Sequence, residues 1–235
     1  MVMSQEYEQR DFRKGPETFT SKEFFDKIFD ASRLRDFKGQ AAVVDLMSGP
    51  GLVALAMRER APQHSYTVLD ASIKLLDQLA QKDPTIGTIR ADVRDLYPVG
   101  DQSIDVALVR YGLKDIPEGE QPSTLSGIFR KIKPGGVLVI ADMVSSETPE
   151  GAKEWNNKQH SLKQQLGVVP RDIEKEGECH IPTEQEWLKM LKEAGFEPEV
   201  AGDHVSKVKT TDWVNSNQID NESREKMDNK LMQSP

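Results

Sequence analysis

The chain has 235 residues, 37% of them hydrophobic and 30% charged, a length and composition that indicate one globular domain with polar ends. Its formal net charge of -8 argues against nucleic acid and anionic membranes as partners, because both attract basic proteins. The single cysteine, Cys179, excludes an intrachain disulfide and a cysteine-based zinc site. No apolar run approaches bilayer length, and the opening residues lack a signal-peptide core, so we expect a cytoplasmic protein without membrane insertion.

The N-terminal part of the chain predicts an arm and a helix. Residues 1–16 are polar and unpatterned, which is typical of an arm without packing partners. From Thr20 to Phe37 apolar residues recur at helical spacing, and Thr20 with Glu23 matches a capping box, so we predict an amphipathic helix. Two roles stay open for this helix: a lid over a ligand pocket, or permanent packing against the edge of a sheet.

Strands and helices alternate from residue 41 onward. Short apolar runs predict strands at 41–47, 66–70, 88–92, 104–110 and 137–142. Helices are predicted at 52–60, 73–81 and 123–131, and Pro134-Gly135-Gly136 predicts a turn before the fifth strand. This alternation predicts an α/β fold, with a doubly wound, Rossmann-like, mostly parallel sheet covered by helices on both faces.

The last third of the chain is less regular. It predicts a polar helix at 151–166, a loop at 167–182 and a helix at 183–194. That last helix begins with a second capping box, Thr183 with Glu186, and stops before Gly195. Weaker strand candidates at 197–201 and 204–209 would complete a seven-stranded sheet, and the polar residues after 221 predict disorder.

Polar and glycine residues gather where three predicted strands end. Gly49 and Gly51 follow the first strand, where they allow a sharp turn and the close approach of a ligand; a plain strand-to-helix turn is the alternative explanation. Asp70 ends the second strand, where doubly wound nucleotide folds place an acid that binds ribose, and Asp92 ends the third, where a side chain pairs with adenine. Each acid alone also fits a helix cap.

Taken in this order, residues 40–200 resemble class I S-adenosylmethionine-dependent methyltransferases, in particular the small-molecule branch of ubiquinone and menaquinone C-methyltransferases. The motifs that carry the resemblance are the 45–51 loop, Asp70, Asp92, the 131–136 turn and Glu193-Ala194-Gly195-Phe196. We accordingly expect an N-terminal arm and amphipathic helix at 1–38, a class I methyltransferase domain at 39–214 and a polar tail at 215–235. Ser48 and Pro50 depart from the family pattern, and Pro50 removes one backbone donor.

The same resemblance implies S-adenosylmethionine as the cofactor and no metal. It places the methionine part of the cofactor on the 45–51 loop, the ribose at Asp70, the adenine at Asp92 and the floor of the pocket at Arg110 and Tyr111. The implied cofactor-binding residues are Asp45, Met47, Ser48, Gly49, Gly51, Asp70, Ala71, Asp92, Val93, Arg110, Tyr111 and, from the N-terminal arm, Arg13.

Catalysis by such a protein depends chiefly on alignment, because methyl transfer from a sulfonium is an in-line displacement in a dry pocket. An oxygen or carbon acceptor can still need a general base. His180 and His160 are the candidates, since both fall in the irregular region after the fifth strand, where this family builds its acceptor pocket; each also fits a surface histidine. The implied acceptor is a small metabolite such as a quinone or a polyketide.

Three other functions remain open. A nicotinamide dehydrogenase shares the fold and tolerates Gly49, Gly51 and Ala54 as its glycine pattern, but it has no role for Asp92 or for the Lys-Pro-Gly-Gly turn. A methyltransferase-fold protein can also use the cofactor structurally, for a cyclisation or another non-transfer reaction, or can serve as a cofactor-binding partner subunit. The expected partner is a small-molecule acceptor, and a homodimer is left open.

Overall fold

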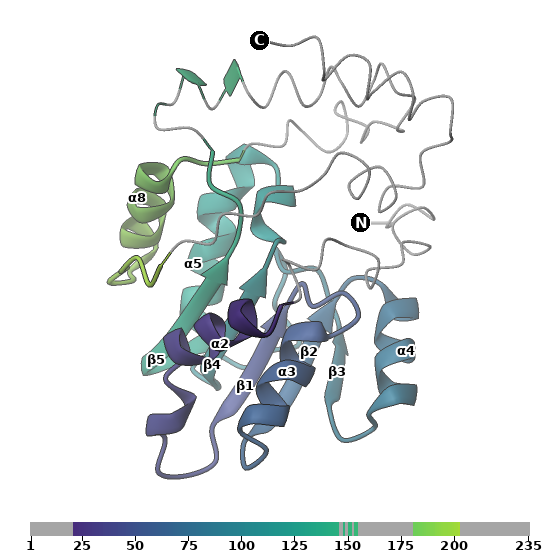
Figure 1. Cartoon of the computed structure of the whole chain (residues 1–235). Coiled ribbons are helices and arrows are strands. Elements are labelled where there is room, and N and C mark those ends of the chain that lie inside the picture. Colours follow the sequence, from purple (N-terminus) through teal and green to yellow (C-terminus); the bar gives the residue numbers. More distant parts are fainter. Residues whose placement is uncertain (1–20, 146–147, 149, 152, 155–180, 203–235) are drawn as a thin grey trace, which may run out of the picture.

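The computed structural model describes residues 21–145, 148, 150–151, 153–154 and 181–202 (Figure 1). The main elements in chain order are α2 (Lys22–Ala31), η3 (Leu34–Asp36), β1 (Ala42–Leu46), α3 (Leu52–Arg60), β2 (Ser65–Asp70), α4 (Ile73–Lys82), β3 (Gly87–Arg90), β4 (Ile104–Arg110), η4 (Leu113–Asp115), η5 (Glu118–Glu120), α5 (Gln121–Lys131), β5 (Ile132–Ala141) and α8 (Glu184–Ala194). Within these ranges no helix combines the length and the apolarity that crossing a membrane requires.

The described strands form one parallel sheet of five strands in the order β3-β2-β1-β4-β5. The central strand β1 pairs with β2 on one side and with β4 on the other, so Val44 lies between Thr67 and Ala107. This confirms the predicted α/β doubly wound, Rossmann-like sheet. Seven strands are not confirmed: residues 197–201 carry no strand, and 204–209 lie outside the described residues.

Helices cover the sheet in two layers, each with its own core. The apolar faces of α2, α3 and α4 share one buried cluster with alternate residues of the central strands. The second cluster joins α5, α8 and the loop after β3 to the other face of the sheet. In Figure 1, α2 and α3 lie in front of the sheet, and α5 and α8 lie together on its other side. Burial on both faces explains why β1 and β4 are almost continuously apolar.

The N-terminal helix is a fixed part of the first layer. Its four apolar side chains are at most 9% exposed; they are Phe24, Phe25, Ile28 and Phe29. Arg60 of α3 donates from Nε and Nη2 to Asp26 Oδ1, at 2.9 and 2.8 Å, and so ties α2 to its neighbour. The structure therefore favours permanent packing of this helix, and the predicted lid is not confirmed.

The bounds of this helix differ from the prediction. Ser21 is the N-cap and accepts a hydrogen bond from Phe24 N–H at 3.2 Å, so the predicted capping box with Glu23 is wrong; Thr20 lies outside the described residues. The helix stops at Ala31 because Arg33 takes the left-handed conformation (φ 54°), which breaks the helical path toward Phe37.

A second correction concerns the predicted turn at 134–136. These residues lie inside β5, which begins directly after α5 ends at Lys131. The pairing of β4 with β5 shifts register between Ile104 and Val106, as at a β-bulge. A Cβ on Gly136 would lie 2.9 Å from the Asp105 carbonyl oxygen, so the glycine permits close approach of two strands here.

The C-terminal helix matches its prediction. Thr183 and Glu186 form the capping box, and Gly195 ends α8 in the left-handed conformation (φ 106°). The indole of Trp187 donates to the Met143 carbonyl at 3.2 Å and fixes α8 beside the end of β5. Most of the predicted polar helix at 151–166 lies outside the described residues.

Candidate functional site

Strained backbone marks the carboxyl edge of the sheet between β1 and β4. At this point the strand order reverses, because the chain continues from β1 to β2 on one side and from β4 to β5 on the other, and ligands of doubly wound folds bind there. Each strand is followed by a non-glycine residue in the left-handed conformation, Met47 (φ 55°) and Tyr111 (φ 52°). A Cβ on Gly112 would lie 2.8 Å from the Met47 sulfur, so the two turns touch. Strain of this kind concentrates at functional sites.

The end of β1 and the loop after it hold two buried polar atoms without a hydrogen-bond partner among the described residues, Asp45 Oδ1 and Ser48 Oγ. Asp45 is 1% exposed, and its Oδ2 accepts from Ala54 N–H in the first turn of α3 at 3.0 Å. Burial raises the pKa of Asp45 to about 7, although the Ala54 hydrogen bond and the charge of Arg110 both favour the carboxylate. An unpaired buried oxygen is costly, and a ligand that brings its own donors would offset this cost.

Two glycines give this loop its shape. Gly49 (φ 53°) and Gly51 (φ 72°) are left-handed, a conformation that glycine adopts without steric cost. Gly51 N–H donates to the Ser48 carbonyl at 2.9 Å and so closes a turn. Pro50 has no N–H group, but this turn does not use one from residue 50. Gly51 is also the N-cap of α3 and offers no side-chain cap, which leaves the first turn of that helix suited to an anionic group.

Asp70 fastens the glycine loop to the end of β2. Its carboxylate is 3% exposed, and it accepts from Gly49 N–H at 2.7 Å and from Ser72 N–H at 2.9 Å. Burial raises the pKa of Asp70, against the backbone hydrogen bonds from Ser72, Gly49 and Ala71. The N-cap of α4 is Ser72, which accepts from Leu75 N–H, so Asp70 is not the helix cap that remained an alternative.

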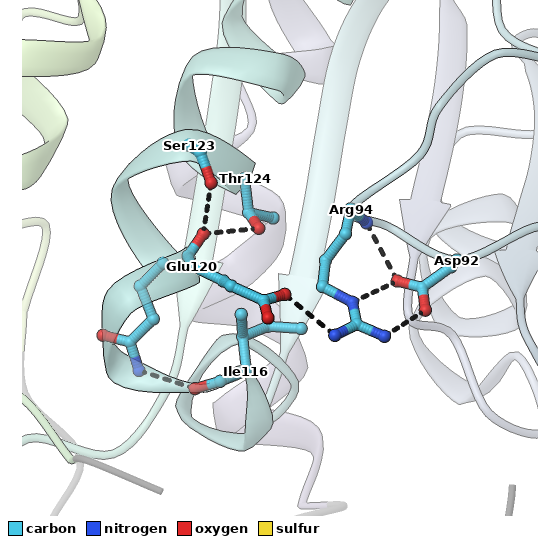
Figure 2. Close-up of polar contacts among 7 residues, drawn as sticks. Asp92, Arg94, Ile116, Glu120, Ser123 and Thr124 are labelled. Carbon is cyan, nitrogen blue, oxygen red and sulfur yellow. Dashed lines mark hydrogen bonds and ion pairs between the residues drawn. The ribbon is translucent and has the colours of Figure 1, made fainter. Parts of the chain in front are cut away.

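Asp92 lies two residues beyond the end of β3 and is held in an ion-pair network (Figure 2). Its Oδ1 accepts from Arg94 Nε at 3.0 Å and its Oδ2 from Arg94 Nη2 at 2.7 Å. Arg94 Nη1 also donates to Glu120 Oε2 at 2.8 Å, just before α5. The hydrogen bonds from Arg94 hold the pKa of Asp92 below its ordinary value, so Asp92 is ionised at neutral pH. Val93, its predicted companion, is buried in the second core cluster.

Tyr111 and Arg110, the predicted floor residues, lie at the end of β4 beside a residue that the sequence did not indicate. The ring of Phe24 from α2 stacks on Tyr111, with centroids 5.9 Å apart and planes 2° from parallel. The Arg110 guanidinium lies 5.5 Å from the Tyr111 ring centroid, a cation–π contact. Burial raises the pKa of Tyr111 to about 12, so the phenol stays neutral and can donate a hydrogen bond.

A further acid, Asp142, follows β5 on the same edge. It accepts from Lys114 N–H at 3.3 Å and from Met143 N–H at 2.8 Å, and it is close enough to Tyr111 to raise the pKa of that phenol. Burial raises the pKa of Asp142 to about 6, with the charge of Lys114 opposing. The sequence analysis did not single out Asp142, although it ends the strand predicted at 137–142 just as Asp70 and Asp92 end theirs.

Comparison with known proteins identifies the class. The family model described as "Methyltransferase domain" matches residues 43–136, a range that contains all of the strand ends described above except that of β5. Residues 43–136 are a methyltransferase domain. This match agrees with the class predicted from the motifs, an S-adenosylmethionine-dependent methyltransferase.

Curated proteins and a solved structure that are similar to this chain fit the same assignment. The chain is 28% identical over 173 residues to a ubiquinone/menaquinone biosynthesis C-methyltransferase of Bartonella tribocorum, covering 66% of this chain and 63% of the relative. It is 31% identical over 108 residues to a demethylmenaquinone methyltransferase of Chlamydia trachomatis, covering 45% of this chain and 46% of the relative. The YcgJ protein of Bacillus subtilis has the same fold, with a TM-score of 0.71, 15% identity, and coverage of 90% of this chain and 84% of that chain. The chain thus spans between about half and two thirds of the length of these curated relatives.

The residues of the methyltransferase domain fit S-adenosylmethionine. The unpaired acceptors Asp45 Oδ1 and Ser48 Oγ suit the ammonium of its methionine part, and the first turn of α3, whose N-cap Gly51 has no side chain, suits its carboxylate. Asp70 keeps acceptor capacity for ribose hydroxyls, since each carboxylate oxygen can accept about two hydrogen bonds.

Three of the predicted site residues lie outside the described residues, namely Arg13, His160 and His180. Ala71 follows Asp70 at the site edge, as predicted. In the part of the chain that the structure describes, no cluster of three or more His, Cys, Asp or Glu side chains could hold a metal ion.

Proposed function

We propose that this chain binds S-adenosylmethionine at the carboxyl edge between β1 and β4 and that it transfers the methyl group to oxygen or carbon of a small metabolite in the cytoplasm. The observation that carries the proposal is the glycine loop with two buried, unpaired oxygens, Asp45 Oδ1 and Ser48 Oγ, beside two strained turns. A ligand that supplies donors and positive charge would offset the cost of such a loop.

Residues at three neighbouring strand ends would bind different parts of the cofactor. When bound, the cofactor supplies an electrophilic methyl carbon on a positively charged sulfur. Asp45 and Ser48 would hold the methionine part, Asp70 the ribose and Asp92 the adenine. Because Asp70 also accepts from Gly49 N–H, it keeps the loop at the end of β2 and so couples the ribose position to the methionine position.

The acceptor would lie beside Tyr111, Arg110 and Asp142, on the side of β4 and β5. This edge combines an aromatic stack, a cation and a half-buried acid, which suits a flat, oxygen-bearing ring. Quinone precursors are the first acceptors to test, because the two relatives named above are quinone-biosynthesis methyltransferases. His180, with His160 as second choice, is proposed as the base that takes the acceptor's proton.

The experiment is a screen for formation of S-adenosylhomocysteine. Purified protein is incubated with S-adenosylmethionine and a panel of quinone precursors, phenols and polyketides, and the product is quantified by mass spectrometry. We expect product with at least one oxygen- or carbon-nucleophile of the quinone class. Cofactor binding without S-adenosylhomocysteine from any acceptor would instead support a structural cofactor or a partner subunit.

The Asp45→Asn variant is the matched control for this screen. It keeps the size of the side chain but removes the negative charge that would pair with the cofactor's ammonium. We expect this variant to form less S-adenosylhomocysteine than the wild-type protein, and the product that it still forms sets the non-enzymatic background.

A further inference from the structure

The network of Asp92, Arg94 and Glu120 joins the loop after β3 to the start of α5 (Figure 2). Arg94 donates to Asp92 from its backbone N–H at 3.0 Å, from Nε at 3.0 Å and from Nη2 at 2.7 Å. Nη1 of the same guanidinium donates to Glu120 Oε2 at 2.8 Å. Figure 2 shows Arg94 lying between the two acids, so its position is fixed from both sides.

These contacts use most of the acceptor capacity of Asp92. A carboxylate offers about four acceptor positions, and the Arg94 donors take both positions on Oδ1 and one on Oδ2. Among the described residues no donor takes the second position on Oδ2, which can therefore serve a ligand. Because it can only accept, it distinguishes a purine that carries an amino group at position 6 from one that carries a carbonyl oxygen there.

We propose that Arg94, held by Glu120, is a positioning residue that fixes the Asp92 carboxylate with one acceptor site turned to the purine, and so makes the methyltransferase domain select adenine. This inference rests on the proposed function and adds two residues, Arg94 and Glu120, to the machinery that recognises the base. Neither acts on the ligand directly; both act through Asp92.

A role in folding alone does not account for the network. The side chains are 28% (Arg94), 23% (Asp92) and 50% (Glu120) exposed, and ion pairs at such exposure contribute little to stability. Their geometry, with three donors of one residue on one carboxylate, instead restricts the rotation of Asp92. Restricting an acceptor before the ligand arrives reduces the entropy lost on binding.

The test measures binding of S-adenosylhomocysteine and of its inosine analogue, in which a carbonyl oxygen replaces the 6-amino group, by calorimetry. We expect wild-type protein to prefer the adenine ligand by about tenfold or more, the effect of one charge-assisted hydrogen bond. Arg94→Met should weaken adenine binding about fivefold and reduce the preference, because the carboxylate then rotates and is hydrated. Glu120→Gln should act in the same direction but less, and it leaves the Asp92–Arg94 pair intact if Arg94→Met fails to fold.

A double-mutant cycle shows whether Arg94 acts through Asp92. In the Asp92→Asn background, Arg94→Met should cause no further loss of affinity. Lys131→Met is the matched control: Lys131 pairs with Asp101 at 2.7 Å and ties the same loop to the other end of α5, at the opposite edge of the sheet. This control should keep the wild-type preference between the two ligands.

Two outcomes separate the inference from the function on which it rests. If wild-type protein does not bind S-adenosylhomocysteine, the proposed function fails and the inference fails with it. If wild-type protein binds but Arg94→Met leaves affinity equal or tighter, or weakens both ligands by the same factor, only the role of Arg94 is overturned.

Discussion

Replacing Asp45 by asparagine should stabilise the free protein at alkaline pH while weakening cofactor binding. The Asp45 carboxylate is buried, has one oxygen without a partner among the described residues, and has its pKa raised from 3.8 to about 7 by burial. An acid whose pKa is higher in the folded state contributes stability that is fully present below pH 4 and is lost as the pH rises through about 7. Asparagine has the same shape and no charge, so it escapes this loss.

The magnitude follows from the two pKa values. The interval between 3.8 and about 7 corresponds to roughly 4 kcal/mol of stability lost by the wild-type protein above pH 7. The amide of the variant can still accept from Ala54 N–H, but its own N–H groups lack a partner, which costs about 1 kcal/mol. The variant should therefore be more stable by roughly 3 kcal/mol at pH 8, and the difference should shrink to within about 1 kcal/mol near pH 4.5.

The assay is urea unfolding of both proteins across this pH range, with Asp101→Asn as the control. Asp101 is 68% exposed and pairs only with Lys131 among the described contacts, so its replacement should change stability little at either pH. Calorimetry with S-adenosylmethionine should show affinity for Asp45→Asn reduced by about tenfold or more. A variant that is no more stable than wild type at pH 8, or a difference that does not depend on pH, would refute the view that Asp45 is a buried charge kept for a ligand.

Three further changes test other parts of the site. Asp70→Ala should weaken cofactor binding on the order of 2 kcal/mol, measured by calorimetry, because it removes the ribose acceptor and frees Gly49 N–H; unchanged affinity would exclude Asp70 from the site. Gly112→Ala should lower the free energy of unfolding by about 1–3 kcal/mol in urea, since its Cβ would lie 2.9 Å from the Met47 Cβ; a neutral effect would mean that the two turns do not touch. His180→Ala should reduce turnover by roughly 10² with cofactor affinity intact, and near-normal turnover from pH 6 to 9 would place this histidine on the surface.

The regular elements could be predicted from the sequence because local and global signals agree in them. The helix at Leu52–Arg60 and the strand at Ile104–Arg110 match their predicted bounds, since apolar residues follow one period and turn residues stand at both ends. The N-terminal helix shows where local signals compete. Thr20 and Ser21 both offer a capping hydroxyl, and in the structure Ser21 is the N-cap.

Features that depend on contacts between distant segments escaped prediction. A Pro-Gly-Gly run usually ends a strand, but close approach of Gly136 to Asp105 keeps it within β5. The left-handed conformation of Tyr111 is uncommon for a residue with a side chain, so no local signal indicates it. The pairing of Arg94 with Glu120 joins residues 26 positions apart, and only the fold brings them together.

The central claim is that the glycine loop after β1 holds S-adenosylmethionine at the carboxyl edge between β1 and β4. It is tested most directly by titrating the purified chain with S-adenosylhomocysteine and with NADH side by side in a calorimeter. We predict saturable one-to-one binding of S-adenosylhomocysteine and no heat beyond dilution with NADH. Binding of NADH without binding of S-adenosylhomocysteine would contradict the account and favour the dehydrogenase alternative on the same fold.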